Sequence, residues 1–367
     1  MERFDILVVG GGIAGASLGA RLAGERRVLL IEAEELCGVH ATGRSAAFWQ
    51  GSLGGANPAV KLSLASKPMF DSGWPGSPTP LLRGRGALHL TTAAHGDFAN
   101  FDELPPEYAP RWIGRAELDR QMAGLRAQWT GAWLEPSCAD IDVAAFHGAC
   151  LTAIKRAGGV VRTDGALRSA RRQGEGWEVE TATGTIIVGL LINAAGAWAD
   201  EVARRSDVQP LGLEPRRRTV VQLRVGRSGL KDLPFVTDLH DSFYFKGEAN
   251  RSVWVCPLDE TLVDPCDAAP EELEVAIAVD RFEKAVEWPI EAVERKWAGL
   301  RTFAPDRVMK FGFDQDDDRF FWCVGQGGMG IQTAPAASLL CAALIDGGPM
   351  PPELMGVDPA AFAPLRS

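Results

Sequence analysis

Three glycines and one acid near the start of the chain have the types and spacing needed to bind a dinucleotide. Gly10, Gly12 and Gly15 form a Gly-x-Gly-x-x-Gly turn, and Glu32 follows later in the same unit. Such a turn lets a helix N-terminus point free N–H groups at a pyrophosphate, and the acid can accept hydrogen bonds from ribose hydroxyls. The pattern predicts an ADP-containing cofactor, either a nicotinamide or a flavin.

The surrounding residues predict the elements that would position this turn. Residues 4–9 are typical of a buried strand, small and helix-forming residues follow the turn, and residues 28–31 form a second apolar strand. Gly10 would permit the sharp turn, Gly12 the approach of the pyrophosphate, and Gly15 the packing of helix on strand. The alternative, a glycine-rich loop in an unrelated α/β protein, does not account for all these features together.

Size and composition limit the class of protein. A chain of 367 residues exceeds a usual single core, so two domains are expected. Hydrophobic residues make up 46% of the chain and charged residues 23%, which is typical of a globular protein. The net charge of −10 argues against a nucleic-acid partner, because a protein that grips phosphate usually carries a basic excess.

Cysteine usage and hydropathy predict the compartment. The seven cysteines form no Cys-x-x-Cys pair, which fits a reducing compartment and indicates neither a disulfide framework nor a zinc site. No apolar run approaches the roughly 18 residues of a membrane span, and no removable signal is recognisable before the first strand. The acidic residues 314–318 lack the glycine and glutamate of a calcium loop, since Arg319 and Gly325 stand there. We expect a cytoplasmic protein with no membrane span and no metal site.

Two stretches have compositions that leave their roles open. Residues 40–48 place small residues around one arginine, which suits a segment lying along a cofactor with Arg44 or Ser45 near a phosphate or ring edge. An ordinary surface loop explains this composition equally well. His89 and His95 alternate with apolar or small residues, and we interpret them as ordinary strand and loop residues and not as a catalytic pair.

Two further features each allow a structural and a functional interpretation. The three arginines at 216–218 lie in an extended stretch and by themselves favour a solvated basic edge. Tyr244 lies in an aromatic strand, where core packing is the more common role. Other expected elements are helices over 115–121 and 271–286, a helix capped by Asp142, and separate strands over 185–188 and 190–193.

The order strand, glycine, helix recurs at residues 190–196 and again after residues 320–324. In the second case a glycine loop extends to Pro335 and a helix is expected over 336–345. A helix N-terminus there would stabilise the negative charge that develops on the N1/C2=O side of a flavin accepting a hydride. This arrangement favours flavin over nicotinamide.

Together these segments resemble the FAD-dependent D-amino-acid oxidase superfamily, most closely its D-arginine dehydrogenase type. The similarity runs over nearly the whole chain and in the same order. It is carried by residues 10–17, 31–32, 40–47, 139–142, 193–198, 242–244, 297–301 and 325–333.

The resemblance implies an α/β fold with two domains and bound FAD. The first would be a Rossmann-like FAD-binding domain of the glutathione-reductase type, and the second an α+β substrate domain with a mainly antiparallel sheet. The implied boundaries are 1–46, 138–207 and 297–367 for the FAD-binding domain, and 47–137 and 208–296 for the substrate domain.

The resemblance also implies the site residues. Tyr244 and Arg301 would be catalytic and would hold the substrate carboxylate, with Phe48, Ala87, Arg218 and Gln332 as further substrate contacts. FAD would be bound non-covalently, with Leu167 offering its backbone to the adenine. The implied FAD contacts are Gly10, Gly12, Ile13, Ala14, Gly15, Glu32, Ala33, Ala41, Thr42, Gly43, Arg44, Ser45, Ala46, Ala47, Leu167, Ala195, Gly196, Trp198, Gly327, Gly328, Met329, Gly330, Ile331, Gln332 and Thr333.

The implied reaction is oxidative deamination of a D-amino acid to a 2-oxo acid by hydride transfer from Cα to flavin N5. The D-arginine type has a polar residue at Phe48 and an acid at Ala87, and the apolar residues here predict a neutral, hydrophobic or aromatic substrate side chain. The alternatives are a sarcosine or glycine oxidase-like activity on secondary amines, an RNA-modifying flavoprotein, and a non-catalytic flavin subunit. The electron acceptor stays open between oxygen, a quinone and a carrier, and the protein is expected to be a monomer or small homo-oligomer.

Overall fold

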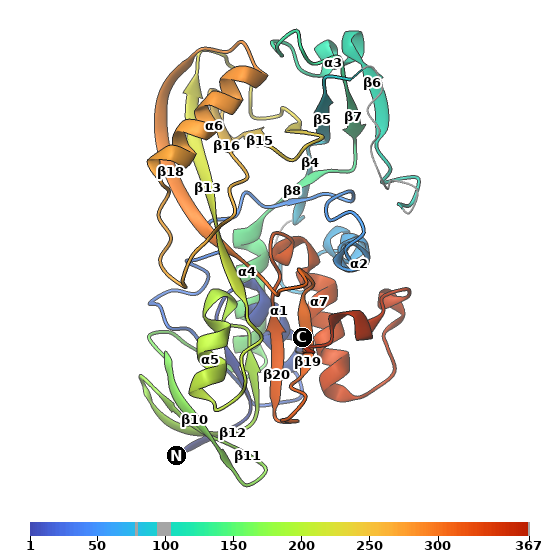
Figure 1. Ribbon diagram of the computed structural model, residues 1–367. Helices are drawn as coiled ribbons and strands as arrows, with labels where there is room; N and C mark the ends of the chain where they lie inside the picture. Colours follow the sequence, from blue (N-terminus) through green and yellow to red (C-terminus); the bar gives the residue numbers. More distant parts are fainter. Residues whose placement is uncertain (78–79, 94–103, 366–367) are drawn as a thin grey trace.

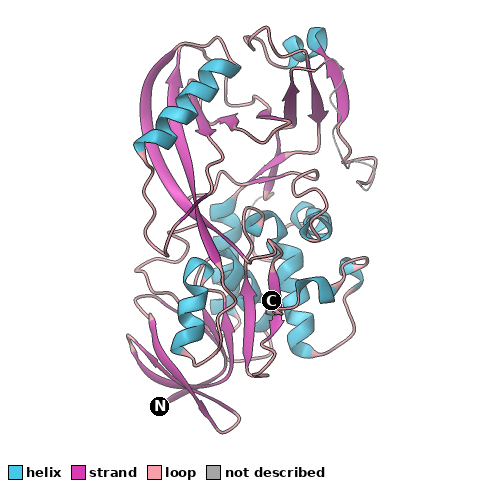
Figure 2. Ribbon diagram, in the orientation of Figure 1, coloured by secondary structure: helices cyan, strands magenta, loops and turns pink. Residues whose placement is uncertain are grey.

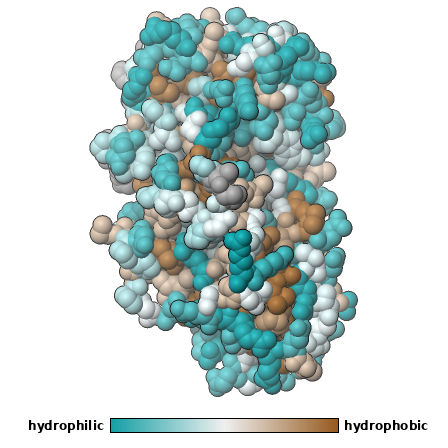
Figure 3. Space-filling view, turned by 180° about the vertical axis from the view of Figure 1, so that it is seen from behind, coloured by the Kyte–Doolittle hydropathy of each residue, from teal (hydrophilic) through white to brown (hydrophobic). Residues whose placement is uncertain are grey.

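The computed structural model describes residues 1–77, 80–93 and 104–365. Figure 1 shows an elongated molecule in which one sheet is surrounded by helices near the N-terminus and a second sheet lies at the opposite end. Figure 2 shows that most helices gather around the first sheet. Figure 3 shows the opposite face, where hydrophilic residues predominate and hydrophobic residues form only small areas.

The first sheet has a parallel core built from buried apolar strands. Its strand β1 alternates between two faces, so that Ile6 and Val8 pack with one hydrophobic cluster and Leu7 and Val9 with another. β10 and β11 form an antiparallel hairpin beside β12, and β19 is antiparallel to β20. The parallel strands in spatial order are β9 (Val160–Arg162), β2 (Val28–Ile31), β1 (Glu2–Val9), β12 (Gly184–Asn193) and β20 (Phe320–Val324), and the added strands are β10 (Leu167–Gln173), β11 (Gly176–Thr181) and β19 (Lys310–Phe313).

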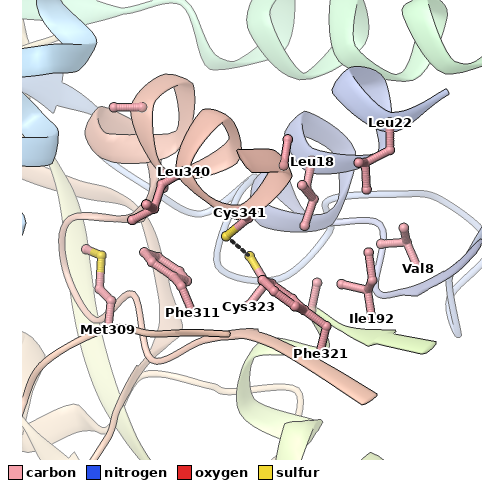
Figure 4. Close-up of a cluster of buried hydrophobic side chains, with 14 of the residues drawn as sticks. Val8, Leu18, Leu22, Ile192, Met309, Phe311, Phe321, Cys323, Leu340 and Cys341 are labelled. Carbon is pink, nitrogen blue, oxygen red and sulfur yellow. Dashed lines mark hydrogen bonds between the residues drawn. The ribbon is translucent and has the colours of Figure 1, made fainter. Parts of the chain in front are cut away.

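Helices cover both faces of this sheet. Figure 4 shows one of the resulting cores, in which Val8, Leu18, Phe321 and Leu340 meet from two strands and two helices. The opposite face packs against α5 through Val202. The helices around this sheet are α1 (Ile13–Leu22), α2 (Ala59–Asp71), α4 (Val143–Arg156), α5 (Ala199–Arg205) and α7 (Gly330–Asp346), with short 3-10 helices η1 (Gly196–Trp198), η2 (Pro352–Leu354) and η3 (Pro359–Phe362).

The second sheet is antiparallel except where β5 and β14 pair in parallel. Two long strands, β13 and β18, run from this sheet toward the first (Figure 1). A small third sheet joins β3 (Phe48–Trp49), β8 (Ala139–Ile141) and β4 (Leu82–Gly84). The second sheet contains β17 (Thr261–Leu262), β13 (Glu214–Val225), β16 (Ser252–Cys256), β15 (Tyr244–Gly247), β14 (Phe235–Asp238), β5 (Ala87–Thr91), β7 (Gly131–Glu135), β6 (Arg111–Gly114) and β18 (Ile290–Phe303), beside α6 (Glu272–Ala285) and α3 (Arg115–Gln121).

The predicted fold class is confirmed: a parallel, helix-covered sheet is joined to a mainly antiparallel one. The domain limits stay a prediction. The limit between 296 and 297 falls inside β18, which pairs with β13 on both sides of that position. Helix α2, within the range assigned to the substrate domain, packs against α7 beside the first sheet.

Most of the expected helices are present with small shifts. The helices over 115–121 and 271–286 and the helix after Asp142 are confirmed, and the Asp142 carboxylate accepts a hydrogen bond from the Ala145 N–H. The two strands over 185–193 are one strand, β12. His95 lies outside the described residues.

The start expected for the last helix is wrong, because α7 begins at Gly330 and not at residue 336. Pro335 cannot donate a backbone hydrogen bond inside this helix. Ser66 of α2 compensates nearby, since its hydroxyl donates to the Thr333 carbonyl and accepts from the Ala336 N–H. The neighbouring helix therefore lets α7 continue through the proline.

Candidate active site

One cavity of about 1350 Å³ lies between the first sheet and the second. The ends of β1, β2 and β12 open into it from one side through Val9, Ile31 and Ala194. Strands β13, β14 and β15 face it from the other side. A ligand crevice at the carboxyl ends of parallel strands is the usual place for a dinucleotide in such folds.

The glycine turn has the geometry that its sequence predicts. Gly10 has φ +111°, and a Cβ there would lie 2.4 Å from the Ala194 carbonyl oxygen. A Cβ on Gly15 would lie 2.0 Å from the Gly10 oxygen, so this glycine allows α1 to pack on the turn. Gly12 lines the cavity, where the absent side chain leaves the backbone open to a ligand.

Glu32 is held in place by the same turn. One carboxylate oxygen accepts from the Gly11 N–H at 2.8 Å, and the other from the Ala33 N–H at 2.7 Å. Glu32 and Ala33 both line the cavity. The carboxylate is therefore fixed at the end of β2, where it fits the hydroxyls of an adenosine ribose.

Arg44 does not offer its side chain to a phosphate. Its guanidinium donates to the carbonyls of Val39, Ala268 and Ala298, and it pairs with the Asp267 carboxylate. The segment 40–48 is thereby anchored to β18, so that its small residues form one wall of the cavity. This position favours the interpretation that residues 40–48 lie along a cofactor over that of a plain surface loop.

The loop before α7 and the first turn of this helix form another wall. Gly327, Gly328, Met329, Gly330 and Ile331 all line the cavity. The helix dipole and the free N–H groups at this end favour negative charge nearby. The arrangement fits the flavin end of FAD.

The side-chain amide of Gln332, in the same turn, has only one of its two polar atoms hydrogen-bonded to a described residue. Its Oε1 accepts from the Gln50 N–H at 3.1 Å, whereas its Nε2 is buried without a hydrogen-bond partner among the described residues. Buried amide groups usually have partners. Since Gln332 also lines the cavity, a bound ligand can supply the missing acceptor.

Arg301 projects from β18 into the cavity wall. A Cβ on Gly328 would lie 2.8 Å from Nη1 of Arg301, so the guanidinium rests against the loop before α7. Burial lowers the pKa of Arg301, and the nearby Arg218 lowers it further. Among the described residues, no group accepts a hydrogen bond from Arg301. The side chain is a desolvated cation whose charge is only partly offset by Glu260, a carboxylate that is hydrogen-bonded to Arg218 and Arg307 instead.

Arg218 lies beside Arg301 and has only part of its hydrogen bonding satisfied. Its Nη2 donates to Glu260 Oε1 at 2.8 Å, and Glu260 also pairs with Arg307. Nε and Nη1 of Arg218 are buried and have no partner among the described residues. The solvated basic edge expected for 216–218 is wrong for Arg217 and Arg218, which are each only 7% exposed, because β17 and β18 flank β13 here.

Tyr244 is buried at the start of β15 and lines the cavity. Burial strongly raises the pKa of its hydroxyl, so the phenol stays neutral and can donate a hydrogen bond. Its ring lies 5.9 Å from that of Phe48 and 5.2 Å from that of Phe235. The three rings form an apolar wall close to the two arginines.

A buried polar network that was not predicted from the sequence lies at the same cavity. His89 Nε2 lies 3.1 Å from Glu135 Oε2, and Ser52 donates to Glu135 through both its N–H and its hydroxyl. His89 is 3% exposed and lines the cavity, so its assignment as an ordinary strand residue is incomplete. These residues lie far apart in the sequence, and no local pattern could have joined them.

Nearly all the residues implied by the resemblance line this cavity. Four do not: Gly15, Gly43 and Thr333 lie behind the lining, and Ala87 is fully buried between β7 and β14. Ala87 therefore does not touch the cavity itself. Those that line it are Gly10, Gly12, Ile13, Ala14, Glu32, Ala33, Ala41, Thr42, Arg44, Ser45, Ala46, Ala47, Phe48, Leu167, Ala195, Gly196, Trp198, Arg218, Tyr244, Gly327, Gly328, Met329, Gly330, Ile331, Gln332 and Arg301.

Within residues 1–77, 80–93 and 104–365, no group of three or more His, Cys, Asp or Glu is placed to hold a metal ion. No helix in this part of the chain combines the length and apolarity needed to cross a membrane.

Solved structures with the same fold include three oxidases. Glycine oxidase from Geobacillus kaustophilus has a TM-score of 0.83 at 21% identity, covering 100% of both chains. The L-alpha-glycerophosphate oxidase from Mycoplasma pneumoniae has 0.83 at 16% identity, covering 94% of this chain and 95% of that one. NikD, an amino acid oxidase of nikkomycin biosynthesis, has 0.80 at 20% identity, covering 99% and 98%. At these identities the likeness shows the fold alone.

The sequence relatives include a dimethylglycine dehydrogenase and a glycine oxidase. Human mitochondrial dimethylglycine dehydrogenase is 25% identical over 266 residues, which is 67% of this chain but 30% of that protein. The chain thus spans about a third of that relative's length. Glycine oxidase of Geobacillus kaustophilus is 22% identical over 369 aligned positions, covering 94% of this chain and 93% of that one. These relatives do not support the D-arginine dehydrogenase type in particular.

A family model described as "FAD dependent oxidoreductase" matches residues 5–344. This range contains the glycine turn, Glu32, the arginines and the first turn of α7. The cofactor is FAD, and the residues that would hold it fit its ribose, pyrophosphate and flavin ends. The chain belongs to the DAO family of FAD-dependent oxidoreductases.

Proposed function

We propose that the protein oxidises a small α-amino acid whose nitrogen is primary or N-methylated, with glycine, sarcosine and dimethylglycine as the first compounds to test. The relatives named glycine oxidase and dimethylglycine dehydrogenase support this proposal over the D-amino acid expected from the sequence. The family supports the coarser statement that the reaction is an FAD-dependent oxidation.

The observation that carries the proposal is the unpaired guanidinium of Arg301. A desolvated cation without a hydrogen-bonded acceptor is costly, and a substrate carboxylate would reduce that cost. A bidentate pair with the carboxylate would also fix the orientation of the substrate. Tyr244 would add one directed hydrogen bond, because its neutral hydroxyl is a donor.

The rings of Phe48, Phe235 and Tyr244 support a substrate with an apolar group. A methyl group on the substrate nitrogen would pack against them, and so would the side chain of a neutral D-amino acid. Oxidation of a neutral D-amino acid is therefore the second candidate function, and D-alanine and D-leucine are the compounds that test it. In both cases Arg301 takes the carboxylate.

FAD, when bound, supplies the electron acceptor for oxidation of the carbon–nitrogen bond. The protein's own contribution is orientation and exclusion of water. Arg301 and Tyr244 hold one end of the substrate, and the aromatic wall confines the other. Held in this way, the substrate loses little further entropy on the way to its transition state.

The test is a comparison of turnover with glycine, sarcosine, dimethylglycine, D-alanine and D-leucine. Ammonia is expected from glycine or the D-amino acids. From the N-methylated compounds, oxidation of an N-methyl carbon gives formaldehyde, and oxidation of Cα gives glyoxylate and the corresponding methylamine. Oxygen uptake measured beside reduction of an artificial acceptor would identify the acceptor type. Turnover of D-amino acids without turnover of glycine or its N-methyl derivatives would contradict the proposal in favour of the second candidate function.

A further inference from the structure

Five carboxylates of described residues line the cavity, and four of them are already engaged. Glu32 accepts from backbone N–H groups, Glu201 pairs with Arg205, and Glu260 pairs with Arg218 and Arg307. Asp238 accepts from the Ser242 N–H at 2.7 Å and from its hydroxyl at 2.6 Å. The fifth, Asp241, accepts no hydrogen bond from any described residue and pairs with no described cation, although it lines the same cavity.

Asp241 lies in the turn between β14 and β15, three positions before Tyr244 in the sequence. Its backbone has φ +49°, a conformation that aspartate and asparagine adopt more readily than most residues.

The turn is fixed from both sides. The two hydrogen bonds from Ser242 to Asp238 close it, and the Thr237 hydroxyl donates to the Phe243 carbonyl at 2.8 Å. Arg281 of α6 donates to the Ser242 carbonyl. These contacts fix the backbone from which the Asp241 side chain projects.

The charges around Asp241 come from several elements. Burial raises its pKa and Asp238 at the end of β14 raises it further, whereas His89 on β5 and Arg218 on β13 lower it. The Arg281 guanidinium contacts the backbone of the turn at the Ser242 carbonyl. The net result is a raised pKa, so this carboxyl group takes up a proton more readily than an exposed aspartate.

The cavity therefore has one cation without a hydrogen-bond acceptor, Arg301, and one carboxylate without a hydrogen-bond donor, Asp241, and the charge of Arg218 acts on both. A zwitterionic amino acid carries the two complementary groups. We propose that Asp241 binds the ammonium group of the substrate and accepts one proton from it. This inference rests on the proposed oxidation of an amino acid.

The proton transfer is a single balanced step. One N–H bond of the ammonium breaks and one O–H bond forms on the Asp241 carboxylate. The nitrogen keeps the electron pair and becomes a neutral amine, which is the form that can be oxidised at the adjacent carbon. The negative charge of Asp241 is neutralised in the same step.

The test uses the FAD-bound protein and two ligands that differ in one group. Sarcosine carries an ammonium group, and methoxyacetate replaces it with an ether oxygen while keeping the carboxylate. In Asp241→Asn, which tolerates the same backbone conformation, sarcosine binding at neutral pH should weaken about tenfold or more, and methoxyacetate binding less than about twofold. Flavin absorbance changes report both dissociation constants.

The rate of flavin reduction by sarcosine gives the second readout. Asp241→Asn should lower it by about 100-fold at neutral pH, and the loss should shrink as the pH rises toward the pKa of the free ammonium. His240→Asn, in the same turn but outside the cavity lining, is the matched control and should behave as wild type. Retained FAD content would show that both variants are folded.

Three results with Asp241→Asn would overturn the proposal: equal weakening for both ligands, an equal rate loss at every pH, or no change at all. The proposed function has a separate failure. If no amine reduces the flavin of the wild-type protein, the proposed oxidation is wrong, while the ligand pair still decides whether Asp241 binds an ammonium group. A wild type that does not distinguish sarcosine from methoxyacetate would remove the role of Asp241.

Discussion

Replacing Arg301 by methionine should separate binding of the substrate carboxylate from every other property of the site. Methionine has a similar length but no charge and no donors. A hydrogen bond to a charged group contributes about 1.5 to 3 kcal/mol, so the dissociation constant of a carboxylate ligand should rise by roughly 10- to 100-fold. Arg301→Lys keeps the positive charge but loses the planar pair of donors, so its dissociation constant should lie between those of wild type and Arg301→Met.

The same change should not destabilise the ligand-free protein. Burial and Arg218 both lower the pKa of Arg301, which means that its charged form is disfavoured where it lies. Removing a desolvated cation that has no partner is neutral or stabilising when the replacement packs as well. The thermal midpoint of Arg301→Met without ligand should therefore equal or exceed that of wild type.

The assay is titration of the FAD-bound variants with methoxyacetate, read by flavin absorbance, beside thermal unfolding. Arg295→Met provides a matched control, because Arg295 is an exposed residue of the same strand β18. An unchanged dissociation constant in Arg301→Met would refute the assignment of the carboxylate site. A large loss of stability would show instead that Arg301 has a structural partner.

Three further changes test how the site is supported. Gly10→Ala should abolish FAD retention, because its Cβ would lie 2.4 Å from a carbonyl oxygen at φ +111°, whereas Gly24→Ala, with no atom within 4 Å, should retain FAD. Asp142→Ala should lower the free energy of unfolding by about 1 kcal/mol in chemical denaturation, through loss of the α4 N-cap. Burial alone would raise the pKa of Asp140, but hydrogen bonds from Arg85 and the charge of Lys246 outweigh it and lower that pKa. The ionised Asp140 carboxylate therefore stabilises the fold above its unfolded pKa of about 3.9, and this stabilisation is lost as pH falls through the lower folded pKa. Asp140→Asn should lower the free energy of unfolding by about 3 to 5 kcal/mol at neutral pH and by less in acid.

The FAD half of the site could be predicted because its signals are local. Gly10, Gly12 and Gly15 are needed for backbone geometry within one turn, and Glu32 ends the next strand. The Asp142 cap and its helix are equally local. In each case residues close in sequence determine the structure, so a pattern in the sequence is enough.

The substrate half depends on contacts between distant segments. Arg217 and Arg218 are buried because β17 and β18 flank β13, and the sequence of β13 alone indicates a solvated edge. The polar side chains at and next to the cavity, among them Glu135 and Asp241, come from different strands and turns of the second sheet. No spacing rule connects them.

The start of α7 shows the same limit on a smaller scale. Pro335 indicates a helix boundary when it is considered alone. Ser66, on a helix from a distant part of the chain, supplies hydrogen bonds to two backbone groups around it, and the helix continues. Tertiary contacts therefore decide where this helix begins, and with it which residues form the flavin end of the cavity.

The most direct test of the account is the addition of single amines to the FAD-bound protein without oxygen. Glycine, sarcosine and dimethylglycine, with D-alanine and L-alanine for comparison, should be mixed with the protein while the oxidised-flavin absorbance is followed. The account predicts that glycine or its N-methyl derivatives bleach this band and that Arg301→Met slows or abolishes the bleaching. A protein that retains FAD but is bleached by none of these amines would contradict it.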